Sequence, residues 1–284
     1  MTTAQISDTF SIGGDLPVHR LGYGAMQLPG PGVWGEPADR AAAVRVVQAA
    51  VEQGVDFIDT ADSYGPEISE QIIAEALHPY ADGLVIATKA GLTRQGPGIW
   101  TPVGRPAYLK QQVELSLRHL KLDRLDLIQL HRIDAEVPLA DQLGAFAELK
   151  EEGKVRHIGV SEVSVEELKA AREVTEIVSV QNLYNLTNRQ SQDVLDYATA
   201  EGIAFIPWFP IATGDLAAPD SPVADIAREL DATPSQVALA WLLQKSPVIL
   251  PIPGTKSVDH LTENLGAAGV RLSAEDMARL DALA

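Results

Sequence analysis

The chain has 284 residues, 46% of them hydrophobic, which is enough to bury the core of one large domain. It carries 39 Asp and Glu against 22 Lys and Arg, and the net charge of −17 argues against nucleic acid or an anionic membrane surface as partners. The absence of cysteine excludes disulfides, cysteine-ligated metal centres and a cysteine nucleophile. Residues 1–10 lack the basic start and apolar run of a signal peptide, and no run approaches about 20 apolar residues, so we expect a cytoplasmic protein.

The predicted elements begin with a β-hairpin, residues 9–12 and 16–19 around Gly13-Gly14, which we expect to cover the bottom of the following sheet. Eight short runs rich in Val, Ile and Leu then predict strands that are buried on both faces. In chain order these runs are residues 19–24, 55–59, 84–89, 125–131, 155–161, 178–182, 203–208 and 248–251. Helical patterns lie between most of them, and glycines such as Gly54, Gly153 and Gly202 end several of these patterns.

Alternating strands and helices predict an α/β fold with a parallel sheet, and eight repeats predict its closure into a (β/α)8 TIM barrel. We expect a single domain over residues 1–284, with the hairpin before the barrel and extra helices at the C-terminus. A doubly wound open sheet is the alternative, and it would place a glycine-rich turn after an early strand. The segment 22–27 lacks the third glycine of that turn and opens no helix, so the barrel is favoured.

Polar residues follow the apolar part of most predicted strands. They are Asp59, Lys89, His131, Ser161, Gln181 with Asn182, and Trp208. In a barrel these strand ends meet at one mouth, where catalytic groups lie. With Tyr64 in the loop after Asp59, the set suits hydride transfer to a carbonyl group. Tyr64 would donate the proton, Lys89 would lower the pKa of Tyr64, Asp59 would hold Lys89 charged, and His131 would orient the carbonyl.

Four segments carry a family resemblance: residues 57–65 with Asp59 and Tyr64, 86–91 with Lys89, 127–131 with His131, and 155–161 with Ser161. Together they resemble the aldo-keto reductases over nearly the whole chain. The resemblance implies the (β/α)8 fold and NADPH-dependent reduction of aldehydes or ketones, with the cofactor extended across the barrel mouth and no dinucleotide-binding glycine motif. It also implies Tyr64 as the general acid, with Asp59, Lys89 and His131 as its partners.

The same resemblance assigns the cofactor site. Ser161, Glu162 and Gln181 would lie at the nicotinamide carboxamide, and Trp208 would stack on the nicotinamide ring. The positions expected along the rest of the cofactor are Gly24, Met26, Phe209, Pro210, Ile211, Gly214, Leu216, Gly254, Thr255, Lys256, His260, Glu263 and Asn264.

Two of these positions depart from the family pattern. Glu162 stands where the family usually has Asn, and a carboxylate cannot donate a hydrogen bond as an amide does. His260 stands where the family often has Arg, and a mostly neutral imidazole weakens the expected grip on the 2′-phosphate. NADPH is therefore the cofactor prediction, with NADH as the alternative.

Long turn-rich loops over residues 29–37, 92–106 and 212–222 are expected to shape the substrate side. Tyr23, Trp34 and Trp100 are the candidates to line it. Residues 21–28 and 31–35 resemble a bacterial branch that includes pyridoxal reductase-like enzymes, so the substrate hypothesis is a flat aromatic aldehyde such as pyridoxal.

Two other classes of function stay open. An NADPH-binding redox-sensing or regulatory subunit, similar to the potassium-channel β-subunits, would show little turnover and form a stable oligomer. The enzyme hypothesis allows a monomer, which is the prediction, with a small-molecule carbonyl compound as partner. A metal-dependent barrel hydrolase would need clustered His and carboxylate ligands at strand ends, yet only His131 of the six histidines ends a predicted strand, so no metal is predicted.

Overall fold

A parallel seven-stranded sheet forms the centre of the computed structural model, which describes residues 7–211 and 221–283. Its strands, in spatial order, are β11 (Ala204–Phe205), β10 (Ser179–Gln181), β9 (Val155–Ser161), β8 (Leu125–Leu130), β5 (Val85–Ala90), β4 (Phe57–Asp59) and β3 (Tyr23–Gly24). Seven of the eight predicted runs therefore contain a strand of this sheet. Gly214, Leu216 and most of the predicted loop 212–222 lie outside the described residues.

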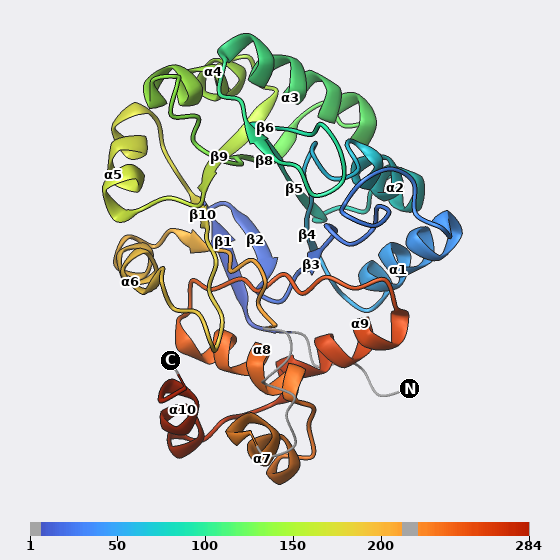
Figure 1. The fold of residues 1–284 in the computed structure, drawn as a ribbon, viewed down its shortest axis with the longest axis vertical. Helices are drawn as coiled ribbons and strands as arrows, with labels where there is room; N and C mark the ends of the chain where they lie inside the picture. The colour runs from blue at the N-terminus through green and yellow to red at the C-terminus, as the bar shows by residue number, and fades with distance from the viewer. Residues whose placement is uncertain (1–6, 212–220, 284) are drawn as a thin grey trace.

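The eighth predicted run, residues 248–251, joins the two edges of the sheet without forming a regular strand. On one side it pairs with β11 through a parallel bridge between Phe205 and Ile249. On the other side Gly22 N donates to Pro251 O at 2.9 Å, and Gly24 N donates to the Pro253 carbonyl at 3.3 Å. These hydrogen bonds close the ring, so the predicted α/β barrel is confirmed, and Figure 1 looks along it with strands inside a ring of helices.

Helices cover the outside of the barrel. In chain order they are α1 (Arg40–Glu52), α2 (Ile68–Leu77), α3 (Pro106–Leu120), α4 (Leu139–Glu151), α5 (Val165–Val174), α6 (Gln192–Glu201), α8 (Pro234–Lys245) and α9 (Val258–Leu265). Residues outside this ring form α7 (Pro222–Glu229), the 3-10 helix η2 (Gly266–Gly269) and α10 (Ala274–Asp281), in agreement with the predicted C-terminal additions. The helical spacing of Leu109, Val113, Leu117 and Leu120 places them on one face of α3, and this face is buried.

The alternation of side chains along the strands separates two layers of core. In β4, Ile58 packs in the outer layer under the helices, whereas Phe57 belongs to an inner cluster with Val85, Ala87 and Leu127. The predicted hairpin, β1 (Thr9–Ile12) and β2 (Leu16–His19), contributes Ile12, Leu16 and Val18 to this inner cluster. Apolar side chains thus fill the bottom of the barrel, and the polar residues of the inner face are left for its other end.

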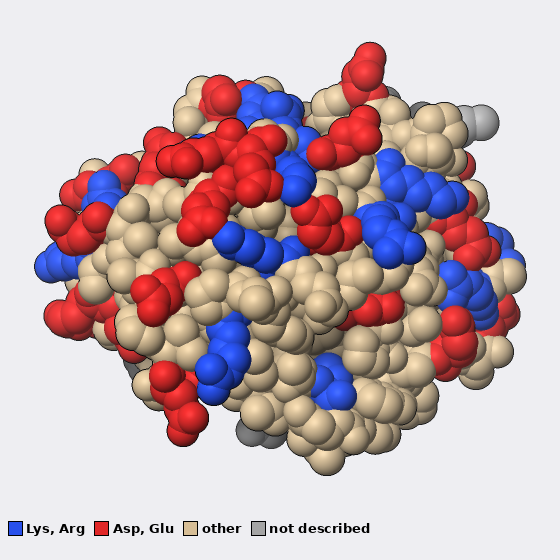
Figure 2. Space-filling model, turned by 90° about the horizontal axis from the view of Figure 1, so that it is seen from above, with Lys and Arg blue, Asp and Glu red and all other residues tan. Residues whose placement is uncertain are grey.

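The loop of residues 92–106 contains a short antiparallel pair, β6 (Leu92–Thr93) and β7 (Thr101–Pro102), that the sequence did not predict. On the face shown in Figure 2, acidic side chains gather at the upper left, and fewer charges lie over the lower part. Within the described ranges, no helix is both long and apolar enough to span a bilayer. The single-domain organisation of residues 1–284 stays a prediction.

Candidate active site

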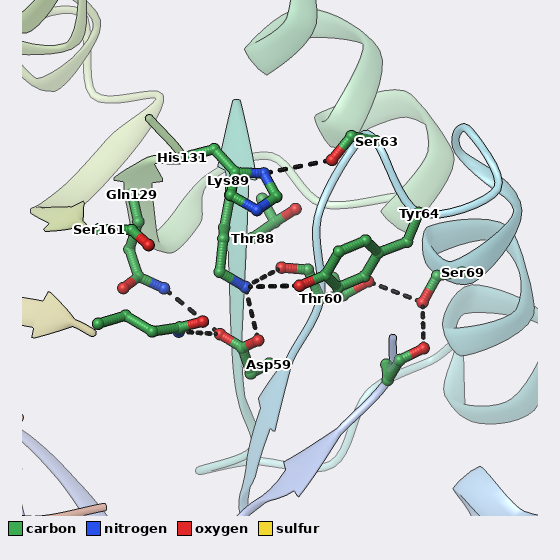
Figure 3. A network of polar contacts seen from close by, with 12 residues as sticks. Asp59, Thr60, Ser63, Tyr64, Ser69, Thr88, Lys89, Gln129, His131 and Ser161 are labelled. Atoms are coloured by element: carbon green, nitrogen blue, oxygen red, sulfur yellow. Dashed lines mark hydrogen bonds and ion pairs between the residues drawn. The ribbon is translucent and has the colours of Figure 1, made fainter. Parts of the chain in front are cut away.

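A buried ion pair lies at the end of the barrel opposite the hairpin. Asp59 ends β4 and Lys89 lies in β5, and both face the interior because of the two-residue period of a strand. Lys89 Nζ donates to Asp59 Oδ2 at 2.6 Å and to the Thr60 carbonyl at 2.8 Å (Figure 3). The exposed fractions of the two side chains are 0% for Lys89 and 2% for Asp59. Burial by itself would lower the pKa of Lys89, but the carboxylate of Asp59 outweighs it, so the pKa is raised and the ammonium is retained.

The hydroxyl of Tyr64 completes this pair. Tyr64 follows β4 in a loop, and its hydroxyl oxygen lies 3.5 Å from Lys89 Nζ. Burial raises the pKa of Tyr64, Lys89 opposes this shift, and the net shift is upward. The predicted lowering effect of Lys89 on this pKa is present, but the net shift is upward because the loss of hydration outweighs the charge. Tyr64 is held as a protonated hydroxyl beside a fixed positive charge.

His131, which directly follows β8, lies beside the ring of Tyr64. Its ring centroid lies 5.9 Å from that of Tyr64 in an edge-on arrangement, and its Nδ1 lies 3.2 Å from Ser63 Oγ. Burial and the positive charge of Lys89 lower the pKa of His131 well below its usual value. The imidazole is therefore neutral near pH 7, and one of its nitrogens is a donor and the other an acceptor.

Asp59 is surrounded by donors. Its Oδ1 accepts from Gln181 Nε2 at 2.8 Å and from Gln129 Nε2 at 3.4 Å, while Oδ2 accepts from Lys89. Sequence reasoning missed Gln129, although it lies two residues before His131 and so on the same inward face of β8. It also missed Thr60 and Ser69, which are hydrogen-bonded to each other and brace the loop that carries Tyr64 (Figure 3).

A cleft of about 360 Å³ leads away from this group across the barrel mouth. At one end it is lined by Asp59, Tyr64 and Trp208, and at the other by side chains of α9. Its floor is formed where β3 approaches the segment after Ile252. A Cβ built on Gly24 would lie 2.5 Å from the carbonyl oxygen of Ile252, so this close approach requires glycine.

This arrangement joins a buried phenol hydroxyl, a buried cation and a neutral imidazole at one end of the cleft. A family model described as the aldo/keto reductase family matches residues 20–284. The chain belongs to the aldo/keto reductase family.

Relatives of this aldo/keto reductase agree with the assignment. A pyridoxine 4-dehydrogenase of Escherichia coli is 46% identical over 283 residues, which cover 98% of each chain. An uncharacterised oxidoreductase of Schizosaccharomyces pombe is 52% identical over 268 residues, 94% of this chain and 87% of that protein. The solved structure of an aldo-keto reductase from Klebsiella pneumoniae in complex with NADPH is 27% identical. It has a TM-score of 0.84 and covers 98% of this chain and 95% of that chain.

Most positions that the sequence assigned to a cofactor line the cleft of this aldo/keto reductase. They are Gly24, Met26, Gln181, Trp208, Phe209, Pro210, Ile211, Gly254, Thr255, His260, Glu263 and Asn264. Ile252 and Pro253, which begin the segment that carries Gly254 and Thr255, line it as well, and so do Gln27 and Ser235, which sequence reasoning missed. Lys256 is exposed and does not line the cleft; its Nζ donates to the Pro29 carbonyl at 3.3 Å.

The two residues at the end of β9 have unexpected partners. Ser161 Oγ accepts from Arg132 Nη1 at 3.0 Å. Glu162 Oε1 accepts from the indole nitrogen of Trp208 and from Leu183 N, both at 2.6 Å. Glu162 thus holds donors of the protein itself, which sequence reasoning did not foresee.

The substrate side differs from the prediction at one residue. Tyr23 is fully buried in the outer layer, and its hydroxyl donates to the Thr255 carbonyl at 2.7 Å. The prediction that Tyr23 lines the substrate side is wrong because residues 22 and 24 take the inward positions of β3 and Tyr23 the outward one. Trp100 does reach the site, with its ring centroid 6.3 Å from that of Tyr64.

Arg94, which the sequence did not single out, ties the loops around Trp34 and Trp100 together. Its guanidinium carbon lies 3.5 Å from the ring centroid of Trp100 and 5.7 Å from that of Trp34. Its Nη1 donates to the carbonyls of Val33 and Ser63 at 2.8 and 2.7 Å. Arg94 therefore connects two of the three predicted substrate loops, residues 29–37 and 92–106, to the loop of Tyr64. Among the described residues, no group of three or more His, Asp or Glu side chains is placed to hold a metal ion.

Proposed function

We propose that this protein is an NADPH-dependent reductase that converts an aldehyde or ketone into the corresponding alcohol. The single observation that carries the proposal is the contact of Tyr64, which lines the cleft, with the buried Lys89–Asp59 pair. Bound NADPH supplies a hydride to the carbonyl carbon. What remains for the protein is to provide a proton and to stabilise negative charge on the carbonyl oxygen.

The side chains at the cleft end can do both. Tyr64 is protonated near pH 7 and would donate its hydroxyl proton to the carbonyl oxygen, and Lys89 would stabilise the phenolate that remains. The neutral imidazole of His131 would orient the carbonyl oxygen as a hydrogen-bond donor. Asp59 would keep the Lys89 ammonium in place while Tyr64 changes from phenol to phenolate and back.

The cleft fits an extended dinucleotide. It has a flat aromatic wall, Trp208, beside the catalytic group and a polar end at Thr255, His260 and Asn264. Ser161 and Gln181 lie at strand ends beside Trp208, where they would hold the carboxamide. Lys256 would provide positive charge for the 2′-phosphate, and the imidazole of His260 would offer it a hydrogen bond. The NADPH complex of the Klebsiella relative supports this choice of cofactor.

For the substrate we propose a flat aromatic aldehyde such as pyridoxal. The name of the Escherichia coli relative, pyridoxine 4-dehydrogenase, supports this choice. Trp100 places an aromatic edge beside Tyr64 and His131, which suits a planar substrate.

The proposal is tested by following NADPH oxidation with pyridoxal and 4-nitrobenzaldehyde, wild type beside Tyr64→Phe, with NADPH binding measured separately by calorimetry. We expect turnover by the wild type and a loss of about 10²- to 10⁴-fold in Tyr64→Phe at unchanged NADPH affinity. NADPH binding without reduction of any aldehyde would instead favour a redox-sensing subunit. Equal KM values for NADH and NADPH would contradict the cofactor assignment, and reduction of 4-nitrobenzaldehyde but not pyridoxal would contradict the substrate.

A further inference from the structure

Glu162 lies in an unfavourable backbone conformation at the edge of the cleft. It follows β9 with a φ of 55°, in the left-handed region that residues with a Cβ seldom adopt. Asn tolerates this region better than Glu does, so the local backbone favours the residue that the family usually has here. A strained residue of this kind persists only where its surroundings hold it.

Two short hydrogen bonds hold the side chain of Glu162. Its backbone N donates to Gln181 O at 3.0 Å, which fixes its place beside the end of β10. Its side chain extends past β10, where Oε1 accepts from Leu183 N and from Trp208 Nε1, both at 2.6 Å. Hydrogen bonds to an ionised acceptor are among the stronger ones in proteins.

The second bond acts on the indole that forms the wall of the cleft. Trp208 is half-buried and lines the cleft, and its backbone N donates to Asn182 O at 3.2 Å. The backbone bond leaves the side-chain torsions free, whereas the bond from Nε1 to Glu162 fixes the edge of the ring. The indole cannot rotate about its side-chain torsions without breaking that bond.

We propose that Glu162 is a positioning residue that holds the Trp208 indole in place as the face for the nicotinamide ring, rather than a ligand of the carboxamide. This inference rests on the proposed function. A carboxylate that lacks a donor is unsuited to the carboxamide oxygen, but it is well suited to an indole N–H. Glu162, which stands where the family usually has Asn, would thus lose a direct contact with the cofactor but hold the Trp208 ring in position before the cofactor binds.

Three variants separate this role from the alternatives. Glu162→Ala removes the acceptor, Glu162→Gln retains an oxygen that can accept from the indole, and Trp208→Phe retains a flat ring without the N–H. Holding a side chain in its bound geometry spares about 0.5–1.5 kcal/mol on binding, which corresponds to about a twofold to twelvefold change in Kd. We therefore expect Glu162→Ala to weaken NADPH binding, measured by calorimetry, by this factor, and Glu162→Gln to stay within about twofold of wild type.

The decisive measurement is the same pair of Glu162 variants made in the Trp208→Phe protein. If Glu162 acts through the indole, Glu162→Ala changes the Kd by less than about twofold in that protein. An equal loss in both proteins would overturn the proposal, because it would show that Glu162 acts directly on the cofactor or through Leu183.

An independent readout needs no cofactor. The protein has four tryptophans, and the indole N–H resonance that is lost in Trp208→Phe identifies Trp208 in the NMR spectrum of the free protein. We expect this resonance to move upfield in Glu162→Ala and to move less in Glu162→Gln. An unmoved resonance in Glu162→Ala would overturn the proposal. Failure of the wild type to bind NADPH would instead overturn the proposed function, and the cofactor role of Trp208 with it.

Discussion

Replacing Asp59 by Asn should reveal how much the buried ion pair contributes to stability. The side chain of Asp59 meets only donors, namely Lys89 at 2.6 Å, Gln181 at 2.8 Å and Gln129 at 3.4 Å. An amide has one acceptor and one donor end, so the introduced side chain would turn an N–H toward at least one of these donors. Breaking a buried pair from one side leaves an uncompensated charge and costs about 3–5 kcal/mol. For a chain of this size, that loss lowers Tm by between about 6 and 20 °C.

The loss should depend on pH, and the direction follows from Lys89. In the wild type the pKa of Lys89 is raised, so its contribution is full below its ordinary pKa of about 10.4 and is lost as pH rises through the raised value. In Asp59→Asn the carboxylate is absent, so burial lowers the pKa of Lys89. The free energy of unfolding of the variant is then reduced below about pH 10.4, and it rises again as pH increases and the ammonium loses its proton. Urea unfolding followed by circular dichroism at pH 7 and at about pH 10 should show the gap between the two proteins narrowing.

Two controls sharpen the test. The double variant Asp59→Asn with Lys89→Met removes both charges and should be more stable than Asp59→Asn alone, because no unpaired charge remains. The exposed pair of Lys150 and Glu176, with a distance of 3.0 Å, provides the surface comparison. Glu176→Gln should cost less than about 1 kcal/mol. The reasoning is refuted if Asp59→Asn costs no more than Glu176→Gln at pH 7.

Three further outcomes follow from the same site. Because burial lowers the pKa of His131, the free energy of unfolding of the wild type should decline as pH falls below about 6.5, by at most about 1.4 kcal/mol per pH unit. His131→Gln should lack this part of the decline. If urea unfolding gave the same pH dependence for both proteins, the prediction would be contradicted. Because the pKa of Tyr64 is raised, kcat/KM for reduction should stay level from about pH 7 to about pH 9. A fall in kcat/KM centred in this range would show that the charge of Lys89 outweighs burial in setting the pKa of Tyr64. Arg94→Lys cannot reproduce the donations to Val33 and Ser63 and should raise the aldehyde KM about tenfold at unchanged NADPH affinity. A weaker NADPH affinity in that variant, measured by calorimetry, would show that the loops also support the cofactor cleft.

The inner face of the barrel could be predicted from the sequence because it follows a local rule. A strand buried on both faces alternates its side chains, so Asp59, Lys89 and His131 share the interior once the strand ends are located. The same rule, applied one residue further, would have placed Gln129 beside them and excluded Tyr23. Those two errors came from choosing residues by type instead of by position along the strand.

Other features depend on contacts between distant parts of the chain. Glu162 meets Trp208 across 46 positions and Arg94 meets Val33 across 61, and no local pattern indicates either contact. The net pKa of Tyr64 was also beyond the sequence, since it depends on how completely the loop excludes water and not only on the presence of Lys89. Burial is a property of the assembled barrel, so the lowering effect of Lys89 on this pKa could be predicted from the sequence but the net upward shift could not.

The distribution of these contacts has a consequence for how the site can change. The Asp59–Lys89 pair rests on adjacent parallel strands whose inner neighbours are fully packed, so a substitution there disturbs the barrel itself. Trp34 and Trp100 lie on loops that the guanidinium of Arg94 joins to the loop of Tyr64. The loop of Trp34 is also joined to it by the backbone, because Gly65 N donates to Val33 O at 3.2 Å and Gly35 N donates to Gly65 O at 2.6 Å. Because Gly65 directly follows Tyr64, we expect a backbone change at residues 33–35 to move Tyr64, whereas a change of the side chain alone at Trp34 leaves these backbone bonds in place. The proposed proton donor and the proposed substrate residues thus lie on loops that are bonded to one another, beside an ion pair that is held by the strands of the barrel.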